Sequence, residues 1–102
     1  MEKHNIIISK IAFEMLDSHV IFLARVSPKS AHSLRKTFKS AIASLYDNPK
    51  GYPLWLPHFE VPYPYRKILI MKRYLILYYK KENNVYVDFF IDNRMDNESL
   101  FT

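Results

Sequence analysis

The side chains best suited to chemistry in this sequence are cations set among tyrosines in its second half. Arginine and lysine hold phosphate groups, and tyrosine rings stack on nucleic-acid bases, so the mixture suits a site for a phosphate-bearing ligand. The competing interpretation is that the tyrosines fill the core and its rim while the cations solvate hairpin turns. The set comprises Lys50, Arg66, Lys67, Lys72, Arg73, Lys80, Lys81 and Arg94, with Tyr65, Tyr74, Tyr78, Tyr79 and Tyr86.

Other reactive groups are sparse. The four histidines lack the spacing of a metal site, and His58, in an aromatic-rich loop, is the best acid/base candidate among them. The absence of cysteine excludes disulfides, thiolate zinc sites and a cysteine nucleophile. The sequence has no glycine-rich phosphate loop and no serine-nucleophile motif. We therefore expect neither a metal nor a cofactor.

Length and charge limit the class of protein. A chain of 102 residues predicts one domain, residues 1–102, and its 49% hydrophobic content is typical of a folded protein. The net charge of +5 favours an acidic partner such as nucleic acid or an acidic protein segment, although many small domains carry such a charge. The early apolar run from Ile6 to Ile8 is too short for a signal peptide or a membrane span. We expect a cytoplasmic protein without a membrane partner.

Three successive β-strands are predicted near the C-terminus. Residues 68–71, 74–80 and 85–91 are rich in β-branched and aromatic side chains, and polar turns separate them. A two-residue turn at Lys72 and Arg73 and a three-residue turn over 82–84 predict an antiparallel meander.

Both faces of this meander are apolar. In the register that these turns give, one face carries Leu69, Tyr74, Ile76, Tyr78 and Phe90. A two-residue turn at Asn83 and Asn84 would instead exchange the faces of the last strand. In that swapped register we expect Leu75 and Phe89 to contact a partner in place of Ile76 and Phe90.

Two helices and a short strand over 4–8 precede the meander. Ser9 is suited to cap a helix from Lys10 to about Val26, and Ser27 with Pro28 starts a second helix that ends near Asn48. A helical hairpin covers one face of a sheet. For the other face we predict either the Pro-rich loop over 49–64 with the last ten residues, or a partner protein.

At the level of whole segments, the sequence resembles a known family. The segment YRKILIMKRYLILYYKKENNVYVDFFIDNRMD resembles the closing part of RelE/ParE-superfamily toxins, the growth-arresting halves of type II toxin–antitoxin modules. The helical part, ISKIAFEMLDSHVIFLARVSPKSAHSLRKTFKSAIASLYDNPKGYP, is similar to the ParE-like branch in its Ser-Pro joint and its Leu-Tyr-x-x-Pro exit. This resemblance covers nearly the whole chain. It implies an α+β fold of β-α-α-β-β-β order, an antiparallel sheet with a helical hairpin on one face.

The resemblance also implies a function. Members that cleave messenger RNA on the ribosome use no metal; they use strand arginines and lysines with a tyrosine or histidine near the C-terminus. This sequence has Leu75 where an arginine commonly follows the strand tyrosine, and Phe101 where a terminal tyrosine would stand. These departures favour the ParE-like branch, whose characterised members block DNA gyrase by binding. A ribosome-dependent mRNA endoribonuclease is the alternative, and a non-toxic RNA-binding or interaction module is the second.

The resemblance also implies residues for catalysis, for target binding and for antitoxin binding. If the protein is an enzyme, Arg73, Tyr79 and His58 are the catalytic candidates. We expect the target or its phosphate to bind Lys67, Arg73 and Arg94, and the target to be gyrase or the ribosome with its mRNA. We expect a cognate antitoxin, in a toxin–antitoxin hetero-oligomer, to bind the sheet face opposite the helices, through Leu69, Tyr74, Ile76, Tyr78 and Phe90.

Overall fold

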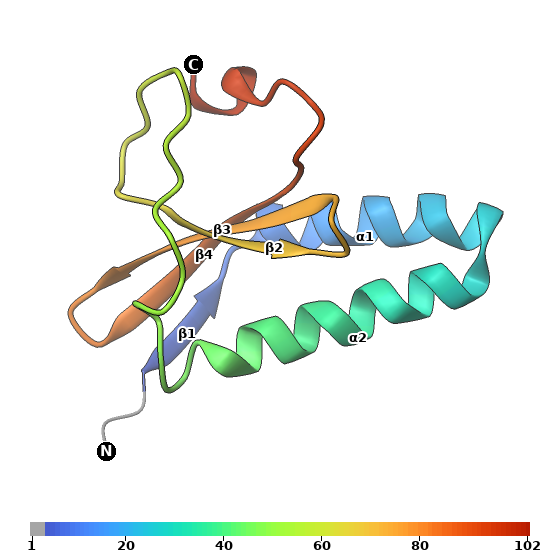
Figure 1. Cartoon of the computed structure of the whole chain (residues 1–102), viewed down its shortest axis with the longest axis horizontal. Helices are drawn as coiled ribbons and strands as arrows, with labels where there is room; N and C mark the ends of the chain where they lie inside the picture. The colour runs from blue at the N-terminus through green and yellow to red at the C-terminus, as the bar shows by residue number, and fades with distance from the viewer. Residues whose placement is uncertain (1–3) are drawn as a thin grey trace.

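The computed structural model describes residues 4–102 and confirms the predicted α+β order of elements (Figure 1). A short 3-10 helix, η1, follows the last strand. The elements are β1 (Asn5–Ile8), α1 (Lys10–Val26), α2 (Pro28–Ser44), β2 (Arg66–Ile70), β3 (Tyr74–Lys81), β4 (Asn84–Asp92) and η1 (Glu98–Phe101).

Both helices begin at the predicted serine caps. The hydroxyl of Ser9 accepts a hydrogen bond from the backbone N–H of Ala12 at 2.9 Å, and that of Ser27 accepts one from Ser30 at 3.2 Å. Pro28 occupies the start of α2, where its missing N–H leaves no hydrogen bond unmade. Ser27 and Pro28 thus form the tight joint of the antiparallel α1–α2 hairpin, which extends beyond the sheet (Figure 1).

The four strands form a mixed sheet in the order β1-β4-β3-β2. The meander is antiparallel, as expected, but β1 pairs parallel to β4, with Ile8 opposite Val87. Parallel strands require a long crossover connection, and the helical hairpin with β2 and β3 supplies it between β1 and β4. β1 therefore forms one edge of the sheet and β2 the other.

The predicted turn between β2 and β3 is wrong by one residue. Ile70 pairs with Tyr74, so the turn comprises Met71, Lys72 and Arg73. Met71 and Lys72 have φ angles of 53° and 58°, a left-handed conformation that local residue preferences disfavour. The shifted register places Ile68 and Ile70 on the same face as Tyr74, which the packing of the core beneath the helices favours.

The predicted turn between β3 and β4 is also wrong, in both versions. Lys81 pairs with Asn84, so the turn consists of Glu82 and Asn83, and Glu82 has a φ of 58°. A β-bulge follows, because Tyr78 pairs with Val87 and Leu77 with Phe89, which leaves Asp88 as the extra residue. The bulge reverses the alternation of β4 at that point.

The bulge and the shifted turn change which side chains face the helices. Tyr74, Ile76, Tyr78 and Phe90 lie in the main core beneath α1 and α2, and none is more than 1% exposed. Their predicted position on the open face is therefore wrong, and a partner cannot reach them in this fold. Of that predicted set, only Leu69 is exposed, at 54%.

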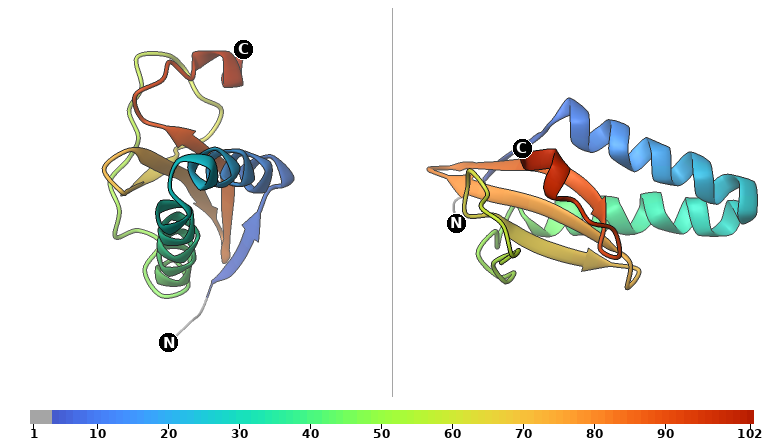
Figure 2. Two further views of the ribbon diagram at one scale, coloured as in Figure 1. Left: turned by 90° about the vertical axis from the view of Figure 1, so that its right-hand side faces the viewer. Right: turned by 90° about the horizontal axis from the view of Figure 1, so that it is seen from above.

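The chain itself covers the opposite face of the sheet, which confirms the first of the two predicted alternatives. Leu75 and Ile91 on this face are buried, and Trp55, Val61 and Phe101 pack against them and their neighbours. The Pro-rich loop and the C-terminal segment lie together over this face of the sheet (Figures 1 and 2). The apolar side chains on this second face of the meander are thus buried by two irregular segments.

Candidate functional site

Two arginines converge on one buried carboxylate at the end of the sheet where β2 turns into β3 and β4 ends. The Nε of Arg73 lies 3.0 Å from Oδ2 of Asp92, and Nη2 of Arg94 lies 3.3 Å from the same oxygen. The backbone N–H of Arg94 donates to Oδ1 at 2.9 Å. The β3–β4 register places Asp92 opposite Tyr74, so its carboxylate is held at the sheet end.

The carboxylate is ionised at neutral pH despite its burial. Burial opposes its charge, but hydrogen bonds from the side chain and backbone of Arg94 and from Arg73 outweigh this and hold the pKa of Asp92 well below its ordinary value. Two cations around one anion leave a net positive charge. The side chain of Arg94 is 65% exposed and that of Arg73 32%, so donors of both guanidinium groups remain accessible to an anionic ligand.

Aromatic rings pack beside and beneath this arginine pair. The guanidinium carbon of Arg73 lies 5.2 Å from the centre of the Tyr74 ring, and the His19 ring of α1 lies 5.0 Å from Tyr74 and 5.6 Å from Phe90. Burial lowers the pKa of His19, while Asp92 opposes the shift and Arg73 adds to it. His19 is therefore a neutral packing group at pH 7.

The hydroxyl of Tyr74 is the one buried side-chain polar atom in the described part of the chain that lacks a hydrogen-bond partner. Its ring carries Arg73 on one face and stacks on Phe90, with centroids 5.2 Å apart. A buried hydroxyl without a hydrogen-bond partner is costly to the fold, which makes this sheet end a candidate site.

Lys67 does not join this cluster. It pairs with Leu77, three residues along β3 from Tyr74, which corresponds to roughly 10 Å along the strand. Because Leu77 packs on the loop-covered face, Lys67 also lies on the other side of the sheet from the arginine pair. Of the three predicted phosphate-binding residues, the structure brings Arg73 and Arg94 together and leaves Lys67 apart.

The catalytic candidates do not converge either. Tyr79 lies five residues along β3 from Tyr74, roughly 17 Å from the arginine end of the strand. His58, in the Pro-rich loop, has an 80% exposed side chain whose Nε2 lies 3.7 Å from Oε1 of Glu98. Tyr79 is therefore separate from Arg73, whereas His58 lines a pocket of about 400 Å³ together with Asn93 and Met95, the sequence neighbours of Arg94.

Tyr79 is also poorly suited to proton transfer. Its ring stacks between those of Tyr63 and Tyr86, at centroid distances of 4.1 and 5.1 Å. Loss of solvent in this stack, followed by the charge of Asp88, raises the pKa of Tyr79 to about 12. A general acid or base works best when its pKa is near the working pH, so this shift disfavours catalysis by Tyr79.

The two departures from the ribonuclease pattern have packing roles. Leu75 is 3% exposed and belongs to the apolar cluster of the loop-covered face. The ring of Phe101 lies 4.9 Å from that of Phe89 and 5.7 Å from that of Trp55. Through these contacts the C-terminal segment packs against the sheet. Neither position faces the arginine pair.

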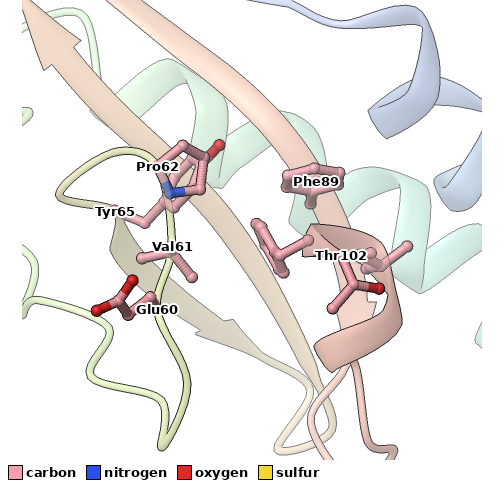
Figure 3. Close-up of a pocket in the computed structure, with 8 residues that line it drawn as sticks. Glu60, Val61, Pro62, Tyr65, Phe89 and Thr102 are labelled. Carbon is pink, nitrogen blue, oxygen red and sulfur yellow. The ribbon is translucent and has the colours of Figure 1, made fainter.

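A cavity of about 560 Å³ opens between the Pro-rich loop and the C-terminus (Figure 3). Glu60, Val61 and Pro62 form one wall, Leu100 to Thr102 form the other, and Tyr65 and Phe89 lie between them. The hydroxyl of Tyr65 donates to Asp88 at 2.6 Å. Because no basic side chain lines this cavity, it does not suit a phosphate-bearing ligand.

Residues 4–102 contain no group of three or more histidine, aspartate or glutamate side chains placed to hold a metal ion. No helix over the same range has the length and apolar character required to cross a membrane.

The sequence interpretation missed Asp92 and His19 as parts of the site. The spacing of Asp92 and Arg94 was a usable signal, because a carboxylate two residues before an arginine at a strand end can hold its guanidinium locally. Arg73 was recognisable as its second partner only from the true β3–β4 register.

Comparison with known proteins identifies the fold. No family model matches the chain, and no curated protein matches it. A solved chain from the chromosomal ParDE toxin–antitoxin system of P. aeruginosa superposes with a TM-score of 0.71 at 14% identity, over 88% of this chain and 96% of that chain. The two chains therefore share one fold, and the β-α-α-β-β-β architecture expected from the sequence is confirmed.

Proposed function

We propose that this protein is the toxin of a type II toxin–antitoxin module and arrests growth by binding its target. The observation that carries the proposal is the arginine pair held by Asp92 at the end of a sheet whose fold is shared with a ParDE chain. Exposed guanidinium donors on a rigid strand end suit an acidic protein surface or a phosphate. The proposed setting is the cytoplasm, with a cognate antitoxin that neutralises the protein in a hetero-oligomer.

Binding is favoured over RNA cleavage because the side chains that cleavage would need are dispersed. General acid/base catalysis requires a proton-transferring group within hydrogen-bond reach of the substrate that the cations hold. Tyr79 lies away from the arginine pair, and Leu75 and Phe101 are packing residues. His58 lines a pocket with Asn93 and Met95, but its Nε2 lies 3.7 Å from Glu98. We therefore propose DNA gyrase, the target in characterised relatives, ahead of the ribosome.

The proposal is tested by expressing Arg94→Ala in a bacterial host without the antitoxin. The side chain of Arg94 is exposed, and without it Asp92 keeps its contacts with Arg73 and with the backbone N–H of residue 94, so the variant should still fold. We expect growth arrest to be lost at an unchanged protein level. Arg25→Ala, at an exposed position in the last turn of α1, is the matched control and should arrest growth like the wild type.

Two results would redirect the proposal. If the wild-type protein does not slow growth at any expression level, the non-toxic RNA-binding or interaction module becomes the better account. If Arg94→Ala arrests growth as the wild type does, the protein is still a toxin but its active surface lies elsewhere.

A further inference from the structure

Aromatic rings line the cavity between the Pro-rich loop and the C-terminal segment (Figure 3). The ring centre of Tyr65 lies 6.1 Å from that of Phe89 and 6.0 Å from that of Phe101, and the rings of Phe89 and Phe101 are 4.9 Å apart. The faces of aromatic rings carry partial negative charge, so a group of rings around a cavity favours a bound cation.

A half-buried carboxylate lies next to these rings. Oδ2 of Asp88, the extra residue of the β-bulge, accepts a hydrogen bond from the hydroxyl of Tyr65 at 2.6 Å. Within residues 4–102 no cationic side chain forms an ion pair with Asp88. Burial raises the pKa of Asp88, and the hydrogen bond from Tyr65 opposes this shift. A carboxylate that is partly removed from water gains from a cation bound nearby.

The two segments that form the walls of the cavity are acidic, although the whole chain has a net charge of +5. Residues 51–65 and 95–102 contain Glu60, Asp96 and Glu98 and neither lysine nor arginine. Glu60 itself lines the cavity, and none of the lining residues is basic. The cavity is therefore opposite in charge to the chain as a whole and complementary to a cationic ligand.

We propose that this cavity binds a free alkylammonium compound, that is, a small amine with a positively charged head and an apolar chain. The ammonium group would lie near the rings of Tyr65 and Phe89, where the charges of Glu60 and Asp88 attract it, and the alkyl chain would lie against Val61. The cavity volume of about 560 Å³ is in the range of small-molecule sites.

This site is distinct from the arginine pair. Phe89 pairs with Leu77 and packs on the loop-covered face of the sheet, whereas Asp92 pairs with Tyr74, whose ring lies in the core beneath the helices. The inference therefore goes beyond the proposed function and does not depend on it. A bound ligand would touch both walls and so stabilise the contact of the Pro-rich loop with the C-terminal segment.

Three probes that share one six-carbon chain test the proposal. At neutral pH n-hexylammonium is positively charged, 1-hexanol is neutral and hexanoate is negatively charged. Amide NMR shifts of the isotope-labelled full chain measure binding and also locate the ligand. We expect hexylammonium to shift the amides of residues 60, 61, 89 and 100–102 saturably. Hexanol should bind at least about fivefold more weakly, and hexanoate more weakly than hexanol.

Matched variants separate the charge from the apolar chain. Glu60→Gln and Asp88→Asn each remove one negative charge and keep the side-chain shape, and the asparagine oxygen can still accept the hydrogen bond from Tyr65. Each should weaken hexylammonium binding about threefold or more and leave hexanol binding unchanged. Glu82→Gln, at an exposed position in the β3–β4 turn outside the cavity, is the matched control and should bind both probes as the wild type. Dispersed amide shifts confirm that each variant is folded.

A variant of the ring lining tests the aromatic contribution. Phe89→Leu keeps an apolar side chain but removes one ring from the cavity. It should weaken hexylammonium binding about fivefold and hexanol binding less.

The inference is overturned if hexylammonium causes no saturable shifts, if the three probes bind equally, or if the shifted amides lie outside the cavity walls. It is also overturned if Glu82→Gln weakens hexylammonium binding as much as Glu60→Gln and Asp88→Asn do. Equal loss of hexylammonium and hexanol binding in the charge variants would contradict the role of the carboxylates.

Discussion

Replacing Asp92 by asparagine tests the physical basis of the arginine site. Asparagine keeps the shape of the side chain and can still accept the 2.9 Å hydrogen bond from the backbone of Arg94, but it removes the charge that both guanidinium groups contact. A hydrogen bond to a charged group contributes about 1.5–3 kcal/mol. Since the side chain of Arg94 is largely hydrated and that of Arg73 partly so, we expect the variant to lose about 1.5–3 kcal/mol in total.

Thermal and urea unfolding measure this loss. For a domain of this size a loss of 1 kcal/mol lowers Tm by about 4–8 °C, so Asp92→Asn should melt about 6–24 °C below the wild type. The urea m-value should be unchanged, because the folded surface is the same. Asp47→Asn, at an exposed turn position, is the matched control and should melt with the wild type.

The pH dependence of this difference separates a charge effect from a packing effect. The pKa of Asp92 is lower in the folded protein than its ordinary value of 3.8, so its carboxylate stabilises the fold fully above that value and progressively less as the pH falls below it. The gap between wild type and Asp92→Asn should therefore be constant from about pH 5 to 8 and shrink below about pH 4. A gap that stays constant down to about pH 2, or no gap at neutral pH, would refute the assignment of Asp92 as an ionised anchor.

Two further predictions concern the dispersed candidates and the C-terminal segment. Purified protein should not cut messenger RNA on ribosomes at the rate of a dedicated ribonuclease, because a missing acid/base group costs about 100- to 10,000-fold in rate; rapid cleavage that is lost in Tyr79→Phe or His58→Ala would make the ribonuclease alternative correct. Phe101→Ala should speed proteolysis of the C-terminal segment, because Phe101 packs on the rings of Trp55 and Phe89. Leu56→Ala, at an 83% exposed position, should not do so, and equal proteolysis of both variants would contradict the packing role.

The elements were predictable because their signals are local. Ser9, Ser27 and Pro28 start the helices where their capping chemistry predicts, and the strands follow the β-branched and aromatic runs. The parallel pairing of β1 could not be predicted from local signals, because it depends on how the helical hairpin returns the chain to the sheet.

The register of the meander was not predictable in the same way. With apolar residues on both faces, a shift by one residue changes the local pattern little. Left-handed φ angles at Met71 and Glu82, two ordinary non-glycine residues, and a bulge at Asp88 fix the register only through the packing of the whole core. For this reason four of the five residues assigned to the antitoxin surface are buried. Arg73 and Arg94 do lie close together, as expected, because both are at strand ends.

The most direct test of the central claim follows DNA supercoiling and protein synthesis in the same culture immediately after induction of the wild-type protein. If the protein arrests growth by binding gyrase through Arg73 and Arg94, plasmid supercoiling should fall first while translation continues and messenger RNA stays intact, and Arg94→Ala should leave supercoiling unchanged. If translation stops first and messenger RNA is cut while supercoiling is normal, the protein acts on the ribosome and the claim is contradicted.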